Sequence, residues 1–526
     1  MTRRRIAALG ALAVVAAAVV LVLASGGGGG GEASSRHGGR IALHTGDFTW
    51  KVAVNGPAAT VAAENRRPGT EDWRLPGGVG RGEVEGYVAS QSVRPGQVQQ
   101  VYVHSKGARW IRVDVYRMGW YGGRGGRLVL ASRRLAQRAQ PPCAHDSRTG
   151  LTECRWHPTI RFPIPTALTS GVYVVKMTTD RGAARDAMFV LEAARPRPIL
   201  AQISTSTYEA YNTWGGDSLY PGGHTVGITG TGQGVEVSYD RPYETVTGAG
   251  QFFTRDVATV RFLERDGYDV SYTTNPSVDA RPGQVRGHRV LLDIGHSEYW
   301  SQPAADSFSH ARDAGTNLVF LASNTMAWRV RFAPATASSG ESGAPDHRII
   351  GYKEHVASDP DRALPSGLFP RGGAPITGTA WHECVTPRVP AVGRSVNHYY
   401  AWRPSAPLTP GWLFRGTGLT AAARRRDRRV RARPHRCELP SRDPDRGRRD
   451  HAVPGKPAAP WRVADDALPR GVRGARLLLG DDGLAARPLA RARRIPRRAA
   501  PGRPAPDPAH REPIRAPPRP LRDPGS

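Results

Sequence analysis

The stretch Val290-Leu291-Leu292-Asp293-Ile294-Gly295-His296-Ser297-Glu298-Tyr299-Trp300 decides the fold of the second half of the chain. Its apolar first half is typical of a strand buried in a parallel sheet. Polar groups that follow such a strand lie at the carboxyl edge of the sheet, where α/β proteins bind ligands. His296 and Glu298 are two residues apart, so in an extended segment they point to the same side. The pattern indicates metal ligation, or acid–base chemistry on a bound water.

Strand and helix patterns alternate on both sides of this stretch. We expect strands at 199–203, 268–273, 288–294 and 318–322, a helix at 257–265 that stops at Gly267, and a helix from the capping residue Ser301 to Ala314. Strand, helix and strand in repetition predict a parallel sheet with crossover helices. Residues 199–420 are therefore predicted to form an α/β domain, with three layers of the flavodoxin or glutamine-amidotransferase type.

The preceding residues, 41–193, have a different pattern. Short strand-like runs such as 84–89 and 110–116 are separated by turn residues at the spacing of a β-sandwich. We predict an immunoglobulin-like sandwich. Trp120, Tyr121 and Trp156 are candidates for a carbohydrate-binding platform, although burial inside the sandwich, or a place at its edge, is the simpler interpretation.

The N-terminus has the pattern of an export signal. Three arginines precede an apolar run over residues 6–24, and small residues at 22–24 offer a cleavage site. Residues 1–24 are predicted to be a signal peptide or an uncleaved membrane anchor, followed by a flexible Gly-rich linker at 25–40. The protein is then secreted or anchored to the cell envelope, with no other contact with a membrane. Cys143 and Cys154 flank a polar loop, and in an exported protein we expect them to form a disulfide.

The net charge of +29 is concentrated in the last 106 residues, which hold 28 basic and 12 acidic side chains. This segment, 421–526, is rich in Arg and Pro and lacks the apolar content of a core, so we predict a disordered tail. Its composition is also what a GC-rich gene yields in a shifted reading frame, and we place such a frame error between Leu419 and Arg424. Nucleic-acid binding is disfavoured because Trp461 is the only aromatic residue available for stacking.

The segment 208–220 is too aromatic for an ordinary solvent-exposed loop. Phenolate oxygens are hard ligands that suit ferric iron. Two tyrosines and a glutamate would hold Fe(III) with open positions, His296 would move a proton, and Asn324 would donate to a developing oxyanion. The alternative is that the tyrosines are structural and that His296 only forms hydrogen bonds at the rim of the sheet.

Several motifs in the right order resemble one known family. They are TYEAYNTWGGDSLY (207–220), VSYDRPY (237–243), FLERDGYDVSYTT (262–274), LLDIGHSEYW (291–300) and ASNTMAWRVRF (322–332). They are similar to the catalytic domain in the large (beta) subunit of N,N-dimethylformamidase, and more closely to its exported actinobacterial relatives. YRMGWYGGRGGR (116–127) resembles the family's preceding sandwich domain. The resemblance covers about residues 85–420.

The resemblance implies a hydrolase that cleaves the C–N bond of a small amide with one iron ion, and that sometimes works with a small partner subunit. Carried over onto this sequence, the ligands of Fe(III) are Glu298, Tyr211 as first choice and Tyr220 as second, with Tyr208, Tyr239 and Tyr243 as rivals. His296 and Asn324 match the family's assisting residues, and Lys353 is a further polar candidate.

This sequence departs from the family pattern after residues 416–419. The family continues with a Gly-Tyr-Glu-like segment whose Glu belongs to the site, whereas this chain enters the Arg/Pro-rich tail. We therefore expect an iron-dependent amide hydrolase that is inactive if the missing part is essential. The alternative from another class is a non-catalytic exported protein that binds ligands at the cell surface. A damaged gene without function is a third interpretation.

Overall fold

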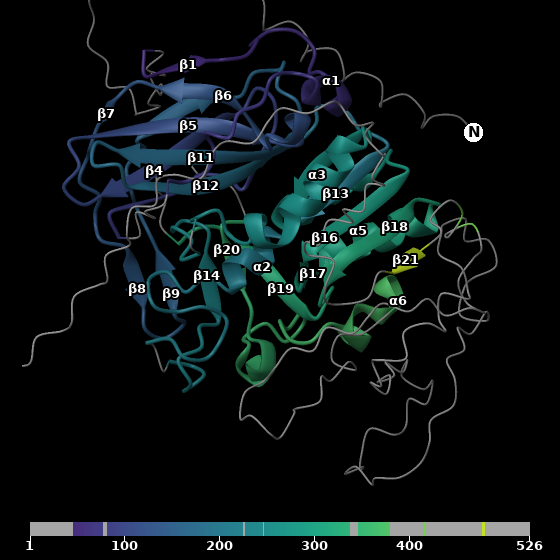
Figure 1. Cartoon of the computed structure of the whole chain (residues 1–526). Coiled ribbons are helices and arrows are strands. Elements are labelled where there is room, and N and C mark those ends of the chain that lie inside the picture. The colour runs from purple at the N-terminus through teal and green to yellow at the C-terminus, as the bar shows by residue number, and fades with distance from the viewer. Residues whose placement is uncertain are drawn as a thin grey trace, which may run out of the picture.

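The structure is a computed structural model, and it describes residues 46–76, 82–224, 227–245, 247–336 and 346–378, residues 412 and 415, and the strand at 476–478. A β-rich first part is followed by a mixed α/β part (Figure 1). The predicted order of the two parts is thereby confirmed. Residues 1–40 and nearly all of 421–526 lie outside the described residues, so the predicted signal, linker and tail stay predictions.

Antiparallel pairing dominates the first part. Its largest sheet has the strand order β1-β6-β5-β11-β12-β3 with β7 beside β5, and a three-stranded sheet has the order β10-β4-β2. The elements of this part are β1 (Phe48–Trp50), α1 (Val61–Asn65), β2 (Val84–Val88), β3 (Ser92–Val93), β4 (Val98–Ser105), β5 (Trp110–Met118), η1 (Tyr121–Gly123), β6 (Gly126–Ser132), β7 (Leu135–Ala136), β8 (Ala144–Asp146), β9 (Leu151–Glu153), β10 (Ile160–Pro163), β11 (Gly171–Thr179) and β12 (Ala184–Leu191).

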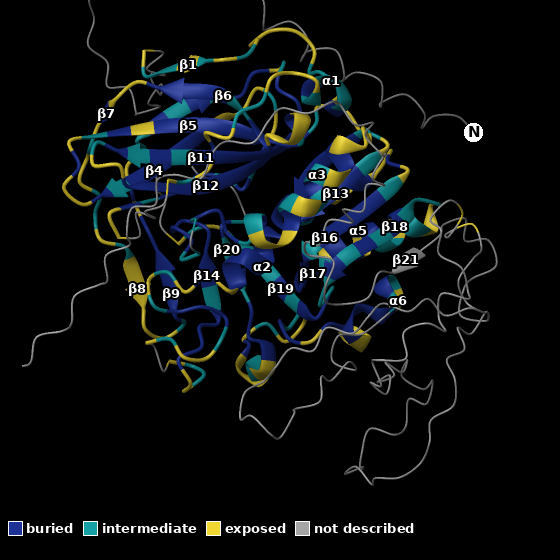
Figure 2. Cartoon of the chain, viewed as in Figure 1, coloured by how far each residue is buried: buried dark blue, intermediate teal, exposed yellow. Residues whose placement is uncertain are grey.

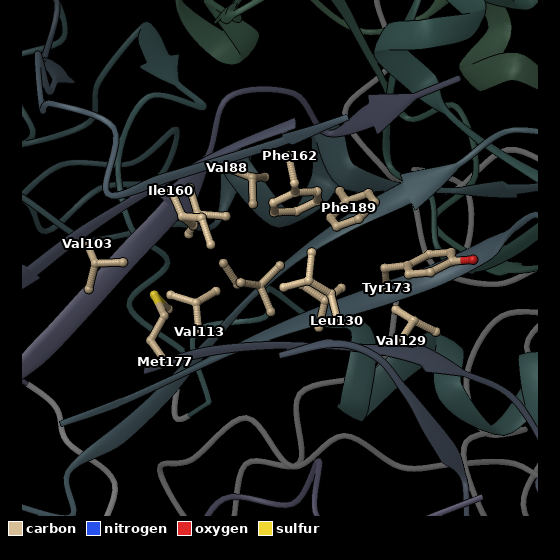
Figure 3. Close-up of a cluster of buried hydrophobic side chains, with 14 of the residues drawn as sticks. Val88, Val103, Val113, Val129, Leu130, Ile160, Phe162, Tyr173, Met177 and Phe189 are labelled. Atoms are coloured by element: carbon tan, nitrogen blue, oxygen red, sulfur yellow. The ribbon is translucent and has the colours of Figure 1, made fainter. Parts of the chain in front are cut away.

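The two sheets of the first part share one apolar core. In β5, alternate residues Ile111, Val113 and Val115 are fully or almost fully buried in it. Val103 and Phe162 reach the same core from the three-stranded sheet (Figure 3). This alternation is the period-two pattern expected when one face of a strand packs on a core.

Parallel strands form the centre of the second part, in the order β15-β13-β16-β18, with β21 beside β18. The elements are β13 (Ile199–Ile203), α2 (Thr205–Ala210), β14 (Glu236–Ser238), η2 (Phe252–Asp256), α3 (Val257–Arg265), β15 (Val270–Thr274), α4 (Asn275–Ala280), η3 (Pro282–Val285), β16 (Val290–His296), β17 (Tyr299–Ser301), α5 (Gln302–Asp313), β18 (Asn317–Ser323), β19 (Trp328–Ala333), β20 (Arg348–Ile350), η4 (Lys353–Ser358), η5 (Pro370–Gly373), α6 (Ala374–Thr377) and β21 (Arg476–Leu478). The predicted strands and helices of this domain are all present.

Helices cover both faces of the parallel sheet. Helix α3 packs Val260 and Leu263 on one face, in a cluster that continues into the outer face of β5 and β11. Helix α5 packs Phe308 on the other face. Ser301 caps α5 as predicted, because its hydroxyl accepts a hydrogen bond from the backbone N–H of Ala304. Figure 2 shows the parallel strands largely buried and an exposed stripe along α3.

A second, smaller sheet lies beside the carboxyl ends of the parallel strands. Its strand order is β14-β20-β19-β17, and β17 follows directly after the Gly295–Glu298 turn. Its buried residues include Tyr299, Trp328 and Val330. Tyr299 and Trp328 of this sheet therefore lie next to the predicted site residues Tyr220 and Glu298.

A buried ion pair joins the two parts. Arg117 of β5 donates two hydrogen bonds of 2.9 Å to the two carboxylate oxygens of Glu264 in α3. Their side chains are 1% and 0% exposed. Burial opposes the charged guanidinium, but the carboxylate of Glu264 outweighs this effect and raises the pKa of Arg117.

Two smaller predictions are also decided. Cys143 and Cys154 form the predicted disulfide. Tyr121 and Trp156 are buried, so the simpler interpretation holds for these aromatics and the carbohydrate platform was wrong for them. Among the described residues, no helix is both long and apolar enough to span a membrane.

Candidate active site

The predicted site lies where β16 and β13 end at the carboxyl edge of the sheet. His296 is the last residue of β16 and pairs in register with Ser323 at the end of β18. Helix α2 begins directly after β13, and Tyr211 caps its C-terminus. The chain order of the strands therefore brings together segments that are about ninety residues apart in sequence, as expected for an open α/β sheet.

The carboxylate of Glu298 is the centre of the site. Tyr211 Oη donates to its Oε2 at 2.7 Å, and Tyr220 Oη lies 3.1 and 3.2 Å from its two oxygens. His296 Nε2 lies 3.2 Å from Oε2, and Trp328 Nε1 donates to Oε1 at 3.0 Å. Both predicted tyrosines and the predicted histidine thus meet the predicted glutamate.

Burial and hydrogen bonding act in opposite directions on Glu298, which is 2% exposed. Burial favours the neutral acid, but the hydrogen bond and charge of His296, the hydrogen bond from Tyr211 and the charge of Lys353 together hold the pKa of Glu298 below its usual value. The same carboxylate acts on the tyrosines. Burial first, and then the negative charge of Glu298, raise the pKa of Tyr211 and of Tyr220 above the ordinary phenol value.

A ring of aromatic side chains surrounds the phenols. The rings of Tyr211 and Tyr220 are 4.3 Å apart, and Tyr299 Oη donates to Tyr220 Oη at 2.9 Å. Lys353 Nζ lies 3.5 Å from the centroid of the Tyr220 ring and donates to the carbonyl of Leu219 at 2.9 Å. Tyr211 is 36% exposed, so solvent reaches the site from its side.

Two of the candidate residues have unusual backbone conformations. Lys353 and Asn324 have positive φ values of 53° and 52°, which are uncommon for residues with a side chain. Such conformations cost free energy and are often found at functional sites. They place Lys353 over the tyrosines and let the carbonyl of Asn324 accept from the N–H of Ala327 at 3.2 Å.

The Gly295–Glu298 turn is held by a hydrogen bond to the buried carboxyl group of Asp293. Ser297 Oγ donates to Asp293 Oδ1 at 2.8 Å, and Gln202 Nε2 donates to the same oxygen at 3.0 Å. Trp300 Nε1 donates to the Ser297 carbonyl at 2.9 Å. Because burial outweighs these hydrogen bonds, the pKa of Asp293 is raised to about 7.

The remaining candidates are placed differently. Tyr208 donates to Asp256, and Tyr243 donates to Gln91 at 3.4 Å, while Tyr239 is buried in the cluster of the smaller sheet. Within the described ranges, these three rival tyrosines form no hydrogen bond to Glu298. The place of Asn324 near the other site residues, and its role as an oxyanion donor, stay predictions.

Sequence reasoning missed two contributors, Trp328 and Asp256. Trp328 Nε1 donates to Glu298, and Asp256 packs against Gly295 so closely that a Cβ built on Gly295 would clash with its Oδ1. Gly295 has φ of 79°, so both its backbone conformation and this contact require glycine. An isolated glycine at the end of a buried strand was the available signal, since it marks close approach of another group.

The donor set fits a hard metal ion. Each of the two phenol oxygens lies 2.7–3.2 Å from a carboxylate oxygen of Glu298, and such oxygens are the ligands that Fe(III) prefers. In the part of the chain that the structure describes, no group of three or more His, Cys, Asp or Glu side chains is arranged to hold a metal ion. Any iron site here therefore depends on the tyrosines.

A cavity of about 350 Å³ lies between residues of the two parts, lined by Arg94, Tyr239, Arg281 and Asp346 among others. Of the candidate residues, the rival Tyr239 lines this cavity, whereas Tyr211, Tyr220, His296, Glu298, Asn324 and Lys353 do not.

The fold and site define an α/β protein with a carboxylate and two tyrosines at the edge of a parallel sheet. The comparison with family models gives the particular family: residues 112–464 match the C-terminal part of N,N-dimethylformamidase beta subunit-like proteins. This match covers more than half of the chain, so the protein belongs to that family. The resemblance found in the sequence motifs is confirmed.

The other comparisons add no argument. No curated protein matches the chain. Among solved structures, a β-glucosidase from Listeria innocua in complex with glucose is 14% identical, with a TM-score of 0.13. This likeness covers 21% of the present chain and 16% of that protein.

Proposed function

We propose that this protein is an iron-dependent hydrolase that cleaves the C–N bond of a small N-substituted amide, with a formamide as the expected substrate type. The observation that carries the proposal is the convergence of Tyr211 and Tyr220 on the carboxylate of Glu298. Family membership supports it, because the name of the family is that of an enzyme acting on N,N-dimethylformamide.

Three side chains would hold the iron: Tyr211, Tyr220 and Glu298. Two phenolates and one carboxylate supply three negative charges, which offset the charge of Fe(III). When bound, the ion would supply a Lewis acid that polarises the amide carbonyl and lowers the pKa of a water. Because metal ligands must lose their protons, loading would release the phenolic protons that Tyr211 and Tyr220 donate to Glu298.

The other residues would act around this centre. His296 lies against Glu298 through Nε2 and would hold and move a proton there. Asn324 would donate to the oxygen of the amide as negative charge develops on it. Lys353 is buried over the Tyr220 ring, where its positive charge favours the anionic form of the neighbouring oxygens.

The test is iron content together with the phenolate-to-iron absorption band. We expect one iron per chain and a visible band in the wild type, and loss of both in Glu298→Gln. Tyr211→Phe and Tyr220→Phe should each weaken the band. Tyr268→Phe is the matched control, because Tyr268 is an exposed tyrosine in the loop after α3, where its ring contacts Phe262. Full iron retention in Glu298→Gln would remove Glu298 from the ligand set.

We also propose that this chain has lost activity relative to its family. The sequence has no Gly-Tyr-Glu segment after residues 416–419, although the family match runs on to residue 464. Sequencing the gene around Leu419, followed by an amidase assay on the repaired frame, tests this. Equal turnover by the present and the repaired chain would contradict it.

The proposal includes the location of the protein, which is secreted or anchored in the cell envelope. It also includes a small partner subunit and no binding of nucleic acid. For the fold, we propose an immunoglobulin-like topology for the first part and a flavodoxin- or amidotransferase-like topology for the second. The alternative function is a non-catalytic binding protein of the cell surface. Purified wild-type protein without stoichiometric iron and without the absorption band would favour that alternative.

A further inference from the structure

The cavity between the two parts of the protein is separate from the site at Glu298. Its volume of about 350 Å³ is within the usual size range of sites for small ligands, roughly 300–1,000 Å³. The first part contributes residues between 89 and 97, around β3. The second part contributes Thr274 at the end of β15, helix α4 and the residues just before β20. The cavity therefore lies at the carboxyl end of a parallel strand, where α/β proteins bind ligands.

Two arginines, one from each part, line this cavity and keep free donor groups. Arg281 at the end of α4 is bound through Nη2, which donates to Glu192 and to Ser277. Its Nε and Nη1 groups have no partner in the described part of the chain. Of Arg94, only the backbone N–H is bonded, to Gln97 Oε1 at 2.7 Å, and its guanidinium has no partner among the described residues. Guanidinium groups with free N–H donors are suited to carboxylates.

Asp346 is the acidic side chain of the lining, two residues before β20. Burial raises the pKa of Asp346, and the positive charges of His347 and Arg281 oppose this effect. The charge of Arg281 thus acts on Asp346, but within the described ranges the two groups form no ion pair, because Arg281 is bound to Glu192. Opposite charges on the walls of one cavity, not paired with each other, suit a ligand that carries both charges itself.

The other charges of the lining already have partners. Glu192 balances Arg281, and His347 Nδ1 lies 3.0 Å from both carboxylate oxygens of Asp240. The charges that remain are one guanidinium and one carboxylate. A ligand that balances both has one negative group, one positive group and no net charge.

We propose that this cavity binds a free α-amino acid. The carboxylate of the ligand accepts hydrogen bonds from Arg94 and Arg281, and its ammonium group donates to Asp346. The apolar side chains of Ala89 and Ala280 also line the cavity and contact the side chain of the ligand. The proposal is independent of the proposed hydrolase function, because the residues assigned to that function do not line this cavity.

The first test compares an amino acid with two derivatives that each lack one charge. The common L-amino acids are titrated into the purified full chain by isothermal titration calorimetry, and the tightest is compared with its N-acetyl and its amide derivative. N-acetylation removes the ammonium group and amidation removes the carboxylate. Each should weaken binding by about tenfold or more, because hydrogen bonds to charged groups are the strong ones. The proposal is overturned if no amino acid binds, or if either derivative binds as tightly as the amino acid.

The second test assigns each charge of the ligand to its partner. Asp346→Asn should weaken binding of the amino acid by about tenfold and bring it close to that of the N-acetyl derivative. Arg94→Gln should in the same way reduce the preference for the amino acid over its amide. Neither side chain has an ion-pair partner among the described residues, so both variants should fold. Asp72→Asn is the matched control, because Asp72 is an exposed carboxylate outside the lining. Wild-type affinity and wild-type preference in Asp346→Asn would overturn the proposal.

Discussion

The ion pair between Arg117 and Glu264 offers the most direct test of how the two parts of the protein are held together. The change is Glu264→Gln. In the native protein both carboxylate oxygens accept a hydrogen bond of 2.9 Å from the guanidinium, and Tyr272 Oη and Asn65 Nδ2 donate to the same carboxylate at 3.0 and 2.7 Å. The glutamine keeps the shape but removes the charge.

The expected magnitude follows from burial. Both side chains are essentially inaccessible, so the variant leaves a guanidinium ion in the interior without its counter-charge. Breaking a buried pair in this way costs about 3–5 kcal/mol of the free energy of unfolding. The amide N–H₂ of the glutamine also faces groups that are themselves hydrogen-bond donors, which lowers the free energy of unfolding further. Removing both charges, with Arg117→Met and Glu264→Leu together, should cost less than the single change.

The assay is urea unfolding at pH 7, followed by tryptophan fluorescence. Asp266→Asn is the matched control. Asp266 lies two residues after Glu264 and forms an exposed ion pair with Arg265, so its loss should leave the midpoint unchanged. The reasoning is refuted if Glu264→Gln unfolds at the wild-type midpoint. It is also refuted if the double variant is no more stable than the single one, because then the buried charge is not the cause.

Three further predictions concern the site and its frame. Gly295→Ala should lose about 1–3 kcal/mol of stability in urea unfolding, because its positive φ is strained for alanine and its Cβ meets Asp256; a wild-type midpoint would contradict this. The carboxyl of Asp293 stays protonated in the native state up to about pH 7 but ionises near pH 4 in the unfolded chain, so stability falls as the pH rises between these values. Asp293→Asn should flatten that part of the stability–pH curve, and an unchanged slope would show that the native carboxyl is ionised. Reduction of the Cys143–Cys154 disulfide, which closes a loop of 11 residues, should lower the free energy of unfolding by about 2–3 kcal/mol, seen as a lower Tm with reductant present.

Much of the fold was readable from local patterns. The apolar run that ends at Ile294, the helix over 257–265 and the cap at Ser301 all appear in the structure within a few residues of the predicted bounds. Hydrophobic periodicity and helix capping depend on residues close together in the chain, so both can be recognised in the sequence. The pairing of His296 with Glu298 also followed from a two-residue spacing in an extended segment.

The choice among the tyrosines is a different matter. Family resemblance ranked Tyr211 and Tyr220 ahead of Tyr208, but spacing could not separate them, because all three lie in one aromatic segment. The structure separates them: the first two reach Glu298, and Tyr208 turns to Asp256. The direction of each tyrosine side chain, on the short helix and in the irregular loop after it, depends on what the ring packs against. A local sequence pattern does not predict that packing.

The sequence by itself determined the order of a β-rich part and a parallel α/β part, the strand end that carries His296 and Glu298, and the disulfide. Tertiary structure alone decided that Asp256 packs on Gly295, that Arg117 and Glu264 meet across the two parts, and that Trp328 binds Glu298. The physical reason is range. Hydrophobic period and capping are properties of neighbouring residues, whereas these contacts join segments up to 147 positions apart, and they form only when the layers pack and buried polar groups must find partners.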